Sequence, residues 1–153
     1  MAGNKSKQSG KSFEANVESV CKHLRASNIA DIVKLPVQKI QNRYGKIIYT
    51  KKSTVDFLGY WRRNGTFICF DTKNRPTSVN SVTIGNDKQK HQIKYLYDAH
   101  LAGCDAFFLI RIRGDRLVKV RPDESWRDKQ AIKIIFDKHI IFDWNNIYNF
   151  LEY

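Results

Sequence analysis

Apolar residues near the start of the chain recur three and four positions apart, at Phe13, Val17, Val20, Cys21 and Leu24. This spacing predicts an amphipathic helix that buries one stripe, and Ser12 is a suitable N-cap, so we predict a helix over residues 12–27. Residues 1–11 are polar and basic, which predicts a flexible N-terminal arm. Such an arm either contacts phosphates or is merely solvated, and the sequence is compatible with both.

Strand patterns follow in several places. Residues 31–35 predict a strand that Pro36 ends. The continuous apolar run over residues 106–112 predicts a strand buried on both faces, with residues 117–120 as its hairpin partner. Residues 132–142 read as extended, with an interruption at 137–138.

Two further helices complete the predicted elements. Residues 87–102 carry an apolar stripe that ends at Gly103, which favours a helix with a glycine stop. Residues 144–153 predict a short terminal helix, and residues 75–88 predict a polar linker without regular structure. Alternating helices and strands of this kind predict a mixed α/β fold in a single domain over residues 12–153.

The segment over residues 54–74 predicts a hairpin that gathers three charged side chains on one face. Asn64-Gly65 is the strongest short-range signal for a two-residue turn, which would place Asp56 opposite Lys73. A four-residue loop would instead shift the register by two residues. Because side chains alternate along a strand, either loop leaves Asp56, Asp71 and Lys73 on the same face. The other face would be apolar, with Val55, Phe57, Ile68 and Phe70.

Two carboxylates and an ammonium on one sheet face suit a metal-dependent phosphodiesterase. Mg²⁺ takes carboxylate oxygens as ligands, and it can activate water and offset charge on a phosphate. A lysine can orient the water or stabilise the transition state. The alternative is an Asp–Lys ion pair on a solvated face, which contributes only about 0.2–1 kcal/mol. Leu58, Phe67 and Cys69 share the charged face, and the cost of desolvating carboxylates among them favours the functional interpretation.

The composition agrees with a polyanionic partner. The 153 residues hold 27 Lys and Arg against 15 Asp and Glu, a formal net charge of +12 that suits nucleic acid. Ribosomal and membrane-surface proteins share such an excess. No apolar run approaches the roughly 20 residues that span a bilayer, so we expect no membrane contact and a cytoplasmic location. Cys21, Cys69 and Cys104 are scattered in apolar surroundings and predict core thiols.

Basic and aromatic residues alternate over residues 37–52. The cations are Lys39, Arg43, Lys46, Lys51 and Lys52, and Tyr44 and Tyr49 lie among them. Such a surface suits phosphate contact and base stacking, although a solvent-exposed hairpin explains the pattern equally well. Arg62 and Arg63, at the turn of the charged hairpin, are further candidates for phosphate contact.

Four short segments occur in a recognisable order. They are Ser53-Thr54-x-Asp56-Phe57-x-Gly59, Phe70-Asp71-x-Lys73, His91-Gln92-Ile93 and Phe107-Phe108-Leu109-Ile110. Together they resemble the RecU family of Holliday junction resolvases, within the PD-(D/E)XK nuclease superfamily, from about residue 10 to residue 113. The resemblance implies a restriction-endonuclease-like α/β/α core, with a mixed central sheet flanked by helices.

The resemblance also implies roles for individual residues. Asp56, Asp71 and the backbone carbonyl of Thr72 would hold Mg²⁺, with Mn²⁺ able to substitute, and Lys73 would be the catalytic lysine. Three residues would support them: Gln92 orienting the lysine or a phosphate, Glu14 near the metal as an outer ligand or water holder, and Thr54 supporting the site or the scissile phosphate.

The function implied is that of a Mg²⁺-dependent endonuclease, bacterial or phage-encoded, that cuts four-way DNA junctions as a homodimer during recombination and repair. Two departures from the family pattern are visible. Asp71 stands where the family more often has Glu, and the stretch between Pro36 and Ser53 is short for the family's junction-inserting stalk. The alternatives are a less selective nuclease on duplex or flap DNA, a non-catalytic DNA-binding protein on the same scaffold, and a ribosomal-type RNA-binding protein.

Overall fold

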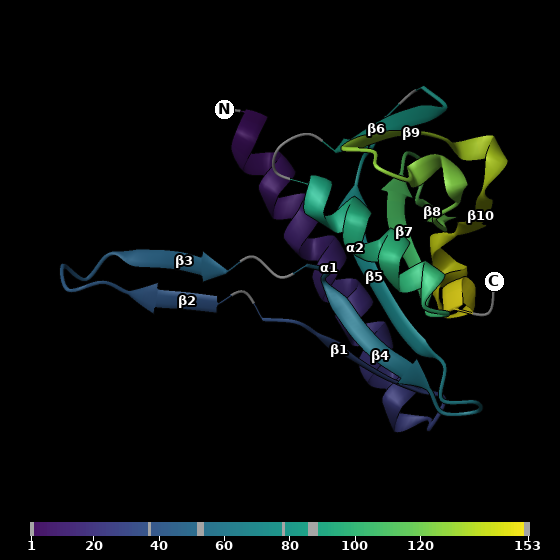
Figure 1. Ribbon diagram of the computed structural model, residues 1–153, viewed down its shortest axis with the longest axis horizontal. Coiled ribbons are helices and arrows are strands. Elements are labelled where there is room, and N and C mark those ends of the chain that lie inside the picture. The colour runs from purple at the N-terminus through teal and green to yellow at the C-terminus, as the bar shows by residue number, and fades with distance from the viewer. Residues whose placement is uncertain (1, 37, 52–53, 78, 86–88, 152–153) are drawn as a thin grey trace.

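A six-stranded sheet forms the centre of the protein in the computed structural model, which describes residues 2–36, 38–51, 54–77, 79–85 and 89–151 (Figure 1). The strand order is β1–β4–β5–β7–β8–β10. The strands are β1 (Ala30–Lys34), β4 (Phe57–Trp61), β5 (Phe67–Asn74), β7 (Asp105–Ile112), β8 (Arg116–Val120) and β10 (Ile140–Asp143). Strands β5 and β7 pair in parallel and the other neighbours pair antiparallel, so the predicted mixed sheet is confirmed.

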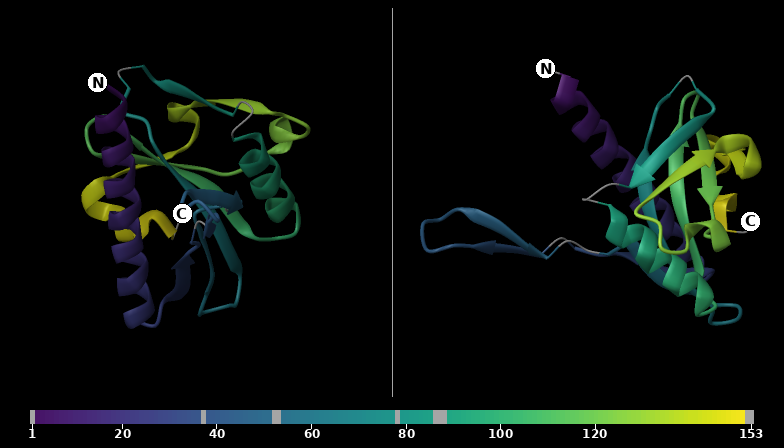
Figure 2. Two further views of the ribbon diagram at one scale, coloured as in Figure 1. Left: turned by 90° about the vertical axis from the view of Figure 1, so that its left-hand side faces the viewer. Right: turned by 45° about the horizontal axis from the view of Figure 1, so that its top comes forward.

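One long helix and one short helix lie on opposite faces of this sheet. Helix α1 (Ala2–Ala26) covers one face and α2 (Lys90–Leu101) the other, as the left panel of Figure 2 shows. A second, two-stranded sheet of β6 (Ser81–Gly85) and β9 (Ala131–Ile135) packs beside α2. Short 3₁₀ turns, η1 (Glu124–Trp126), η2 (Phe136–Lys138) and η3 (Trp144–Leu151), complete the domain. Within the described residues, no helix combines the length and the apolar character needed to cross a membrane.

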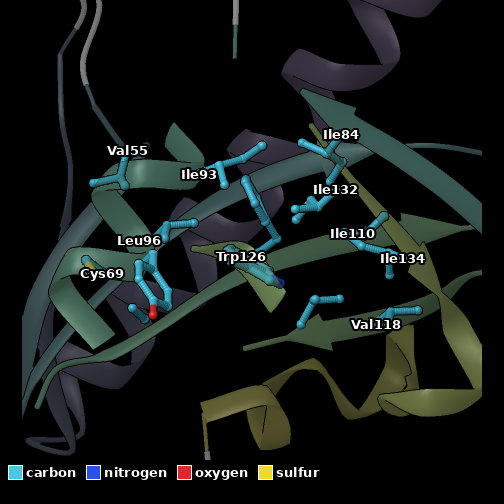
Figure 3. Close-up of a cluster of buried hydrophobic side chains, with 14 of the residues drawn as sticks. Val55, Cys69, Ile84, Ile93, Leu96, Ile110, Val118, Trp126, Ile132 and Ile134 are labelled. Atoms are coloured by element: carbon cyan, nitrogen blue, oxygen red, sulfur yellow. The ribbon is translucent and has the colours of Figure 1, made fainter. Parts of the chain in front are cut away.

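The sheet separates two hydrophobic cores. On the α1 side, Phe57, Phe70 and Phe107 from three adjacent strands stack face to face, with ring centroids 4.8 Å apart in each pair. On the α2 side, Ile93 and Leu96 pack against the sheet (Figure 3). Val55 also lies in this second core, which corrects its predicted position beside Phe57. The reason is that β4 begins only at Phe57, so the strand alternation does not extend back to Val55.

The turn of the charged hairpin differs from the two-residue turn that the sequence predicts. Phe57 pairs with Phe70 and Tyr60 with Phe67, so the four residues 62–65 form the loop. Gly65 has a positive φ of 72°, whereas Asn64 is not among the described non-glycine residues with positive φ. Both central residues of the predicted turn need positive φ. This register puts Asp71, rather than Lys73, across from Asp56.

Two further boundaries differ from prediction. Helix α1 begins at Ala2 rather than at Ser12, so residues 2–11 are helical. No proline interrupts this stretch, and a glycine inside a helix costs only about 1 kcal/mol relative to alanine. The linker predicted over residues 75–88 contains strand β6, in which Ile84 is fully buried opposite Ile132 of β9. The predicted strands over residues 31–35, 106–112 and 117–120 and the helix over residues 87–102 are confirmed within a few residues.

The basic segment over residues 37–52 projects from the body as a separate hairpin. Its strands are β2 (Gln38–Gln41) and β3 (Ile47–Lys51), which pair with each other and with no other strand of the described chain. Figure 1 shows this hairpin extending to one side of the sheet.

Candidate active site

Strands β4 and β5 and helix α2 bring five of the predicted site residues together on the α2 side of the sheet. Asp71, Thr72 and Lys73 belong to the C-terminal half of β5, Asp56 immediately precedes β4, and Gln92 lies in the first turn of α2. Asp71, Thr72 and Lys73 are all buried, with 0%, 7% and 9% of their surface exposed. Burial of an aspartate and a lysine is unusual unless the two charges are paired.

Asp56 occupies the position where the β4–β5 ladder ends. Its Oδ2 atom accepts hydrogen bonds from the backbone N–H and from the hydroxyl of Thr72, both at 2.8 Å. The carboxylate therefore takes the place of a strand partner at the edge of β5. Its backbone carbonyl accepts a hydrogen bond from the N–H of Leu35 at 2.8 Å, which links the residue to the end of β1.

Gly59 allows β1 to approach β4 closely enough for this arrangement. A Cβ at position 59 would lie 1.9 Å from the carbonyl oxygen of Asp31. Any side chain would therefore force β1 away from β4. This contact gives a physical reason for the glycine three residues after Asp56.

Gln92 joins the lysine to the second aspartate. Lys73 Nζ donates a hydrogen bond to Gln92 Oε1 at 2.9 Å, and Gln92 Nε2 donates to Asp71 Oδ1 at 3.0 Å. Lys73 Nζ also lies 2.5 Å from Asp71 Oδ2 as an ion pair. The three side chains form a closed triangle, so the position of the ammonium is fixed by two partners.

The electrostatics of the site centre on Asp71. Its burial, and then the neighbouring Asp56 carboxylate, raise the pKa of Asp71 to about 8, while Lys73 acts in the opposite direction. Although Lys73 contacts Asp71 Oδ2 as an ion pair, no donor in the described part of the chain reaches that buried oxygen with hydrogen-bond geometry. Two adjacent carboxylates with one ammonium leave a local excess of negative charge, which a bound cation would relieve.

These groups suit a hard divalent cation. The under-satisfied Oδ2 of Asp71 and the Asp56 carboxylate are the oxygen donors that Mg²⁺ and Mn²⁺ prefer. The N–H of Thr72 points toward Asp56, and in a strand the carbonyl of the same residue points to the same side of that strand. No cluster of three His, Cys, Asp or Glu side chains that could hold a metal occurs among the described residues. Water and phosphate oxygens would therefore complete the coordination.

Glu14 and Thr54 have other partners. Glu14 forms an ion pair with Lys34 of β1 at 3.0 Å, with both side chains about one-third exposed. Thr54 makes a hydrogen-bond contact with Tyr95, one helical turn after Gln92. Lys34 could not be identified from the sequence, because a lysine at the end of a strand carries no signal for a contact with a distant helix.

The candidate DNA-binding residues lie in two separate places. Arg43 and Lys46 are exposed at the end of the β2–β3 hairpin, where the Arg43 guanidinium lies 4.9 Å from the centre of the Tyr44 ring. Lys39 and Lys51 are in this hairpin, but their side chains, and all of Lys52, lie outside the described residues.

Arg62 and Arg63 are at the opposite end of β4 from the site. Arg62 pairs with Asp31, and the Arg63 guanidinium lies 4.7 Å from the centre of the Trp61 ring. The structure therefore does not bring these two arginines to Asp56 and Asp71.

The fold resembles that of a solved nuclease. The structure of Archaeoglobus fulgidus Hjc, described as a Holliday junction resolvase from an archaeal hyperthermophile, matches with a TM-score of 0.53. The match covers 92% of this chain and 96% of that chain at 9% sequence identity, and at this identity it shows a shared fold alone. Comparison with curated protein sequences gives no significant match.

A family model gives the stronger result. The model of RecU, recombination protein U, matches residues 8–147, which include Glu14, both aspartates, Lys73 and Gln92. The match covers nearly the whole chain and agrees with the fold and with the order of the site segments. The chain therefore belongs to the RecU family of recombination proteins.

Proposed function

We propose that this protein is a divalent-cation-dependent endonuclease that resolves four-way DNA junctions during recombination and repair. The observation that carries the proposal is the closed triangle of Asp71, Lys73 and Gln92 beside a second carboxylate, Asp56, at the open end of the β4–β5 ladder. A surface ion pair would need neither the amide bridge nor the second carboxylate. The family match supports a role in recombination.

In this proposal Asp56, Asp71 and the carbonyl of Thr72 hold Mg²⁺, or Mn²⁺ in its place. The bound cation would act as a Lewis acid that activates the attacking water and offsets the charge that develops on the phosphate. Asp71 must be ionised to bind the cation, so binding would displace the proton that burial and Asp56 favour there.

Lys73 acts on the reacting phosphate and the attacking water. Its ammonium would stabilise the charge on the non-bridging phosphate oxygens and orient the water for in-line attack. Gln92 would hold the ammonium in place through its Oε1 atom. The water oxygen forms a bond to phosphorus and the bond from phosphorus to O3′ breaks. The attacking water releases a proton to solvent, the leaving O3′ takes one up, and the products are a 5′-phosphate and a 3′-hydroxyl.

The projecting β2–β3 hairpin would supply the preference for a junction. Its exposed end carries Arg43, Tyr44 and Lys46, and Tyr44 is 78% exposed. Cationic side chains contact phosphates, and an exposed aromatic ring can stack on the unpaired or splayed bases at a branch point. A linear duplex offers no such bases.

A homodimer follows from the chemistry of resolution. The described residues of one chain carry one such carboxylate–lysine cluster, while resolving a junction needs two symmetric incisions in strands of like polarity. Two chains related by a two-fold axis would supply both active sites. We place this activity in the cytoplasm, on replicating or recombining DNA.

A labelled four-way junction tests the proposal against its alternatives. The junction, a flap and a matching linear duplex would each be incubated with the protein in Mg²⁺, in Mn²⁺ and in EDTA, with Asp71→Ala as the control variant. We expect paired nicks in the junction alone, absent in EDTA and with Asp71→Ala. Equal cleavage of the duplex would instead support a less selective nuclease, which the short hairpin also allows. Tight binding without cleavage in either cation would support a non-catalytic DNA-binding protein.

A further inference from the structure

A pocket apart from the catalytic cluster lies on the same face of the sheet. It has a volume of about 400 Å³ and is built from three segments that are distant in sequence. Thr77, Val79 and Asn80 precede β6; Ile112 ends β7, Arg113 and Gly114 lie in the β7–β8 turn, and Arg116 begins β8; and Phe136 begins η2. Ile112 and Phe136, 4% and 2% exposed, form an apolar floor, and both arginines are exposed at the rim.

The two arginines differ from the other described arginines. Arg25, Arg62, Arg111, Arg121 and Arg127 each form an ion pair with a carboxylate. Arg43 and Arg63 stack on aromatic rings, and Arg75 donates to a backbone carbonyl. Within the described chain, Arg113 and Arg116 have no side-chain partner. Two guanidinium groups at the rim of one pocket can bind an oxyanion with bidentate geometry.

The acidic residues around the pocket reduce its positive charge only in part. Asp115, between the two arginines, is paired with Arg111 at 2.6 Å. Asp137 accepts a hydrogen bond from the Asn80 amide at 2.6 Å, and Lys138 follows it in sequence. Asp143 lies across from Arg116 in the β8–β10 register without an ion pair between them. The neighbouring carboxylates therefore leave both guanidinium groups available.

The position of the pocket relative to Lys73 follows from the sheet register. Lys73 pairs with Ile110 in the parallel β5–β7 ladder, and Ile112 lies on the same face two residues further along β7. At about 3.3 Å per residue, Ile112 is about 7 Å beyond the level of Lys73, and it pairs with Arg116 of β8 and immediately precedes Arg113. Each strand of duplex DNA carries a phosphate about every 3.4 Å along the helix axis, so the pocket and the catalytic cluster are close enough to contact the same duplex arm.

We propose that Arg113 and Arg116 bind a backbone phosphate of a duplex arm, within a few base pairs of the phosphate that is cut. This inference rests on the proposed function in one respect, namely that the substrate is DNA. The pocket would hold the arm in register while the catalytic cluster acts, and it would read no base. It would thus contribute to binding of every arm sequence equally.

The test is the double variant Arg113→Gln/Arg116→Gln, compared with the matched double variant Arg121→Gln/Arg127→Gln. Both lose two positive charges, but the control removes arginines that are already paired with Asp105 and Glu124. Affinity for the junction and for a linear duplex would be measured without a cleaving cation over a salt series. Thermal unfolding would show whether each variant folds as the wild type does.

Loss of one phosphate contact gives a specific pattern. We expect Arg113→Gln/Arg116→Gln to bind both DNAs about 10-fold more weakly. We also expect the slope of log affinity against log salt to fall by about one unit, with the cleavage rate at saturating protein unchanged. Ethylation of one arm phosphate should weaken binding of the wild type and not of this variant. The control should keep the wild-type slope.

Several results would overturn the inference. One is an unchanged DNA affinity and salt slope in Arg113→Gln/Arg116→Gln. Another is an equal loss of DNA affinity in the control variant. A third is that pyrophosphate stabilises the wild type while Arg113→Gln/Arg116→Gln binds DNA as the wild type does. The last result would mean that the pocket takes a small anion instead. If the wild type binds DNA through these arginines but does not cut it, the proposed nuclease function is wrong and the phosphate site still stands. The two proposals can therefore fail separately.

Discussion

Two lysines among the described residues are buried on opposite faces of the same sheet, and each lies close to a phenylalanine of β7. Lys73 lies 5.8 Å from the centre of the Phe108 ring on the α2 side, and Lys119 lies 4.3 Å from the centre of the Phe107 ring on the α1 side. Each also has an aspartate nearby, Asp71 at 2.5 Å and Asp105 at 3.5 Å. Both places thus combine a buried lysine with an aspartate and a phenylalanine ring.

The difference lies in the remaining partners. Lys73 has the Gln92 amide, and its aspartate has a second carboxylate, Asp56, as a neighbour. Asp105 instead has a second cation, Arg121, at 3.1 Å. The first cluster has two carboxyl groups for one ammonium, which suits a bound cation, whereas the second has one carboxyl group for two cations, which does not. A buried lysine alone is therefore no sign of catalysis; the charge balance around it decides.

Exchanging each lysine for methionine should produce the largest contrast. We expect Lys73→Met to lower the single-turnover rate of junction cleavage by about 10²–10⁴-fold, because the ammonium beside the phosphate is lost. Lys119→Met should remain within about threefold of the wild type, which is within the scatter expected of a site outside the chemistry. Equal losses in the two variants would contradict the assignment of Lys73.

Gln92 tests the amide that distinguishes the two lysines. We expect Gln92→Leu to cut about 10–100-fold more slowly, a loss typical for a residue that orients a catalytic group. Its affinity for uncut junction should match that of the wild type, since Gln92 is a positioning residue. Rescue of part of the rate by Gln92→Asn, and unequal effects on binding and rate, would separate this role from general destabilisation.

Lys119→Met should make the protein more stable at neutral pH. Burial above all, opposed by Asp105, lowers the pKa of Lys119 to about 8 from a reference of 10.5. The unfolded state then binds more protons between about pH 8 and 10.5, so the cost of burying this charge is full below pH 8 and is relieved as the pH rises through that window. We expect a gain of about 1–3 kcal/mol at pH 7 that shrinks toward pH 10, measured by denaturant unfolding. A variant less stable than the wild type at pH 7 would contradict this.

Asp71→Asn should show the opposite dependence on pH. The folded state holds the pKa of Asp71 near 8, against a reference of 3.8, so the cation-free protein loses stability as the pH rises from about 4 to 8. In EDTA we expect Asp71→Asn to melt about 2–4 °C above the wild type at pH 8, equivalent to roughly 1 kcal/mol, with no difference near pH 4. Mg²⁺ should raise the melting temperature of the wild type only. A variant that melts below the wild type at pH 8 in EDTA would refute this explanation.

The sequence predicted the grouping of Asp56, Asp71 and Lys73 better than the turn between β4 and β5. Strand alternation places Asp71 and Lys73 on one face, and any loop of even length keeps Asp56 on that face too. The wrong prediction of a two-residue turn at Asn64-Gly65 therefore changed the residue opposite Asp56 but left the three side chains together. Gln92 was predicted as a site residue only from the family resemblance, because a glutamine in the first turn of a helix carries no signal of its own. Glu14 likewise had no local signal, and its ion pair with Lys34 depends on how α1 crosses β1.

Other features could not be predicted from the local sequence pattern. In β8, Lys119 alternates with Val118 and Val120, which would suggest an exposed side chain, yet Lys119 is 2% exposed. Its burial comes from the α1 side core, where Leu117 and Ile147 of η3 also lie. Strand β6 was missed because Val82 and Ile84 alternate with Ser and Thr over only five residues, and their burial depends on β9, about fifty residues later.

The most direct test of the account compares the two aspartates that face the two lysines. Asp71→Asn and Asp105→Asn would be incubated with a labelled four-way junction in Mg²⁺ and in EDTA, and the positions of the nicks would be mapped on all four strands. We predict symmetric paired nicks by the wild type and by Asp105→Asn in Mg²⁺, none by Asp71→Asn, and none in EDTA. Cleavage by Asp71→Asn at the wild-type rate, or cleavage by the wild type that persists in EDTA, would contradict the claim that this cluster is a metal-dependent nuclease site.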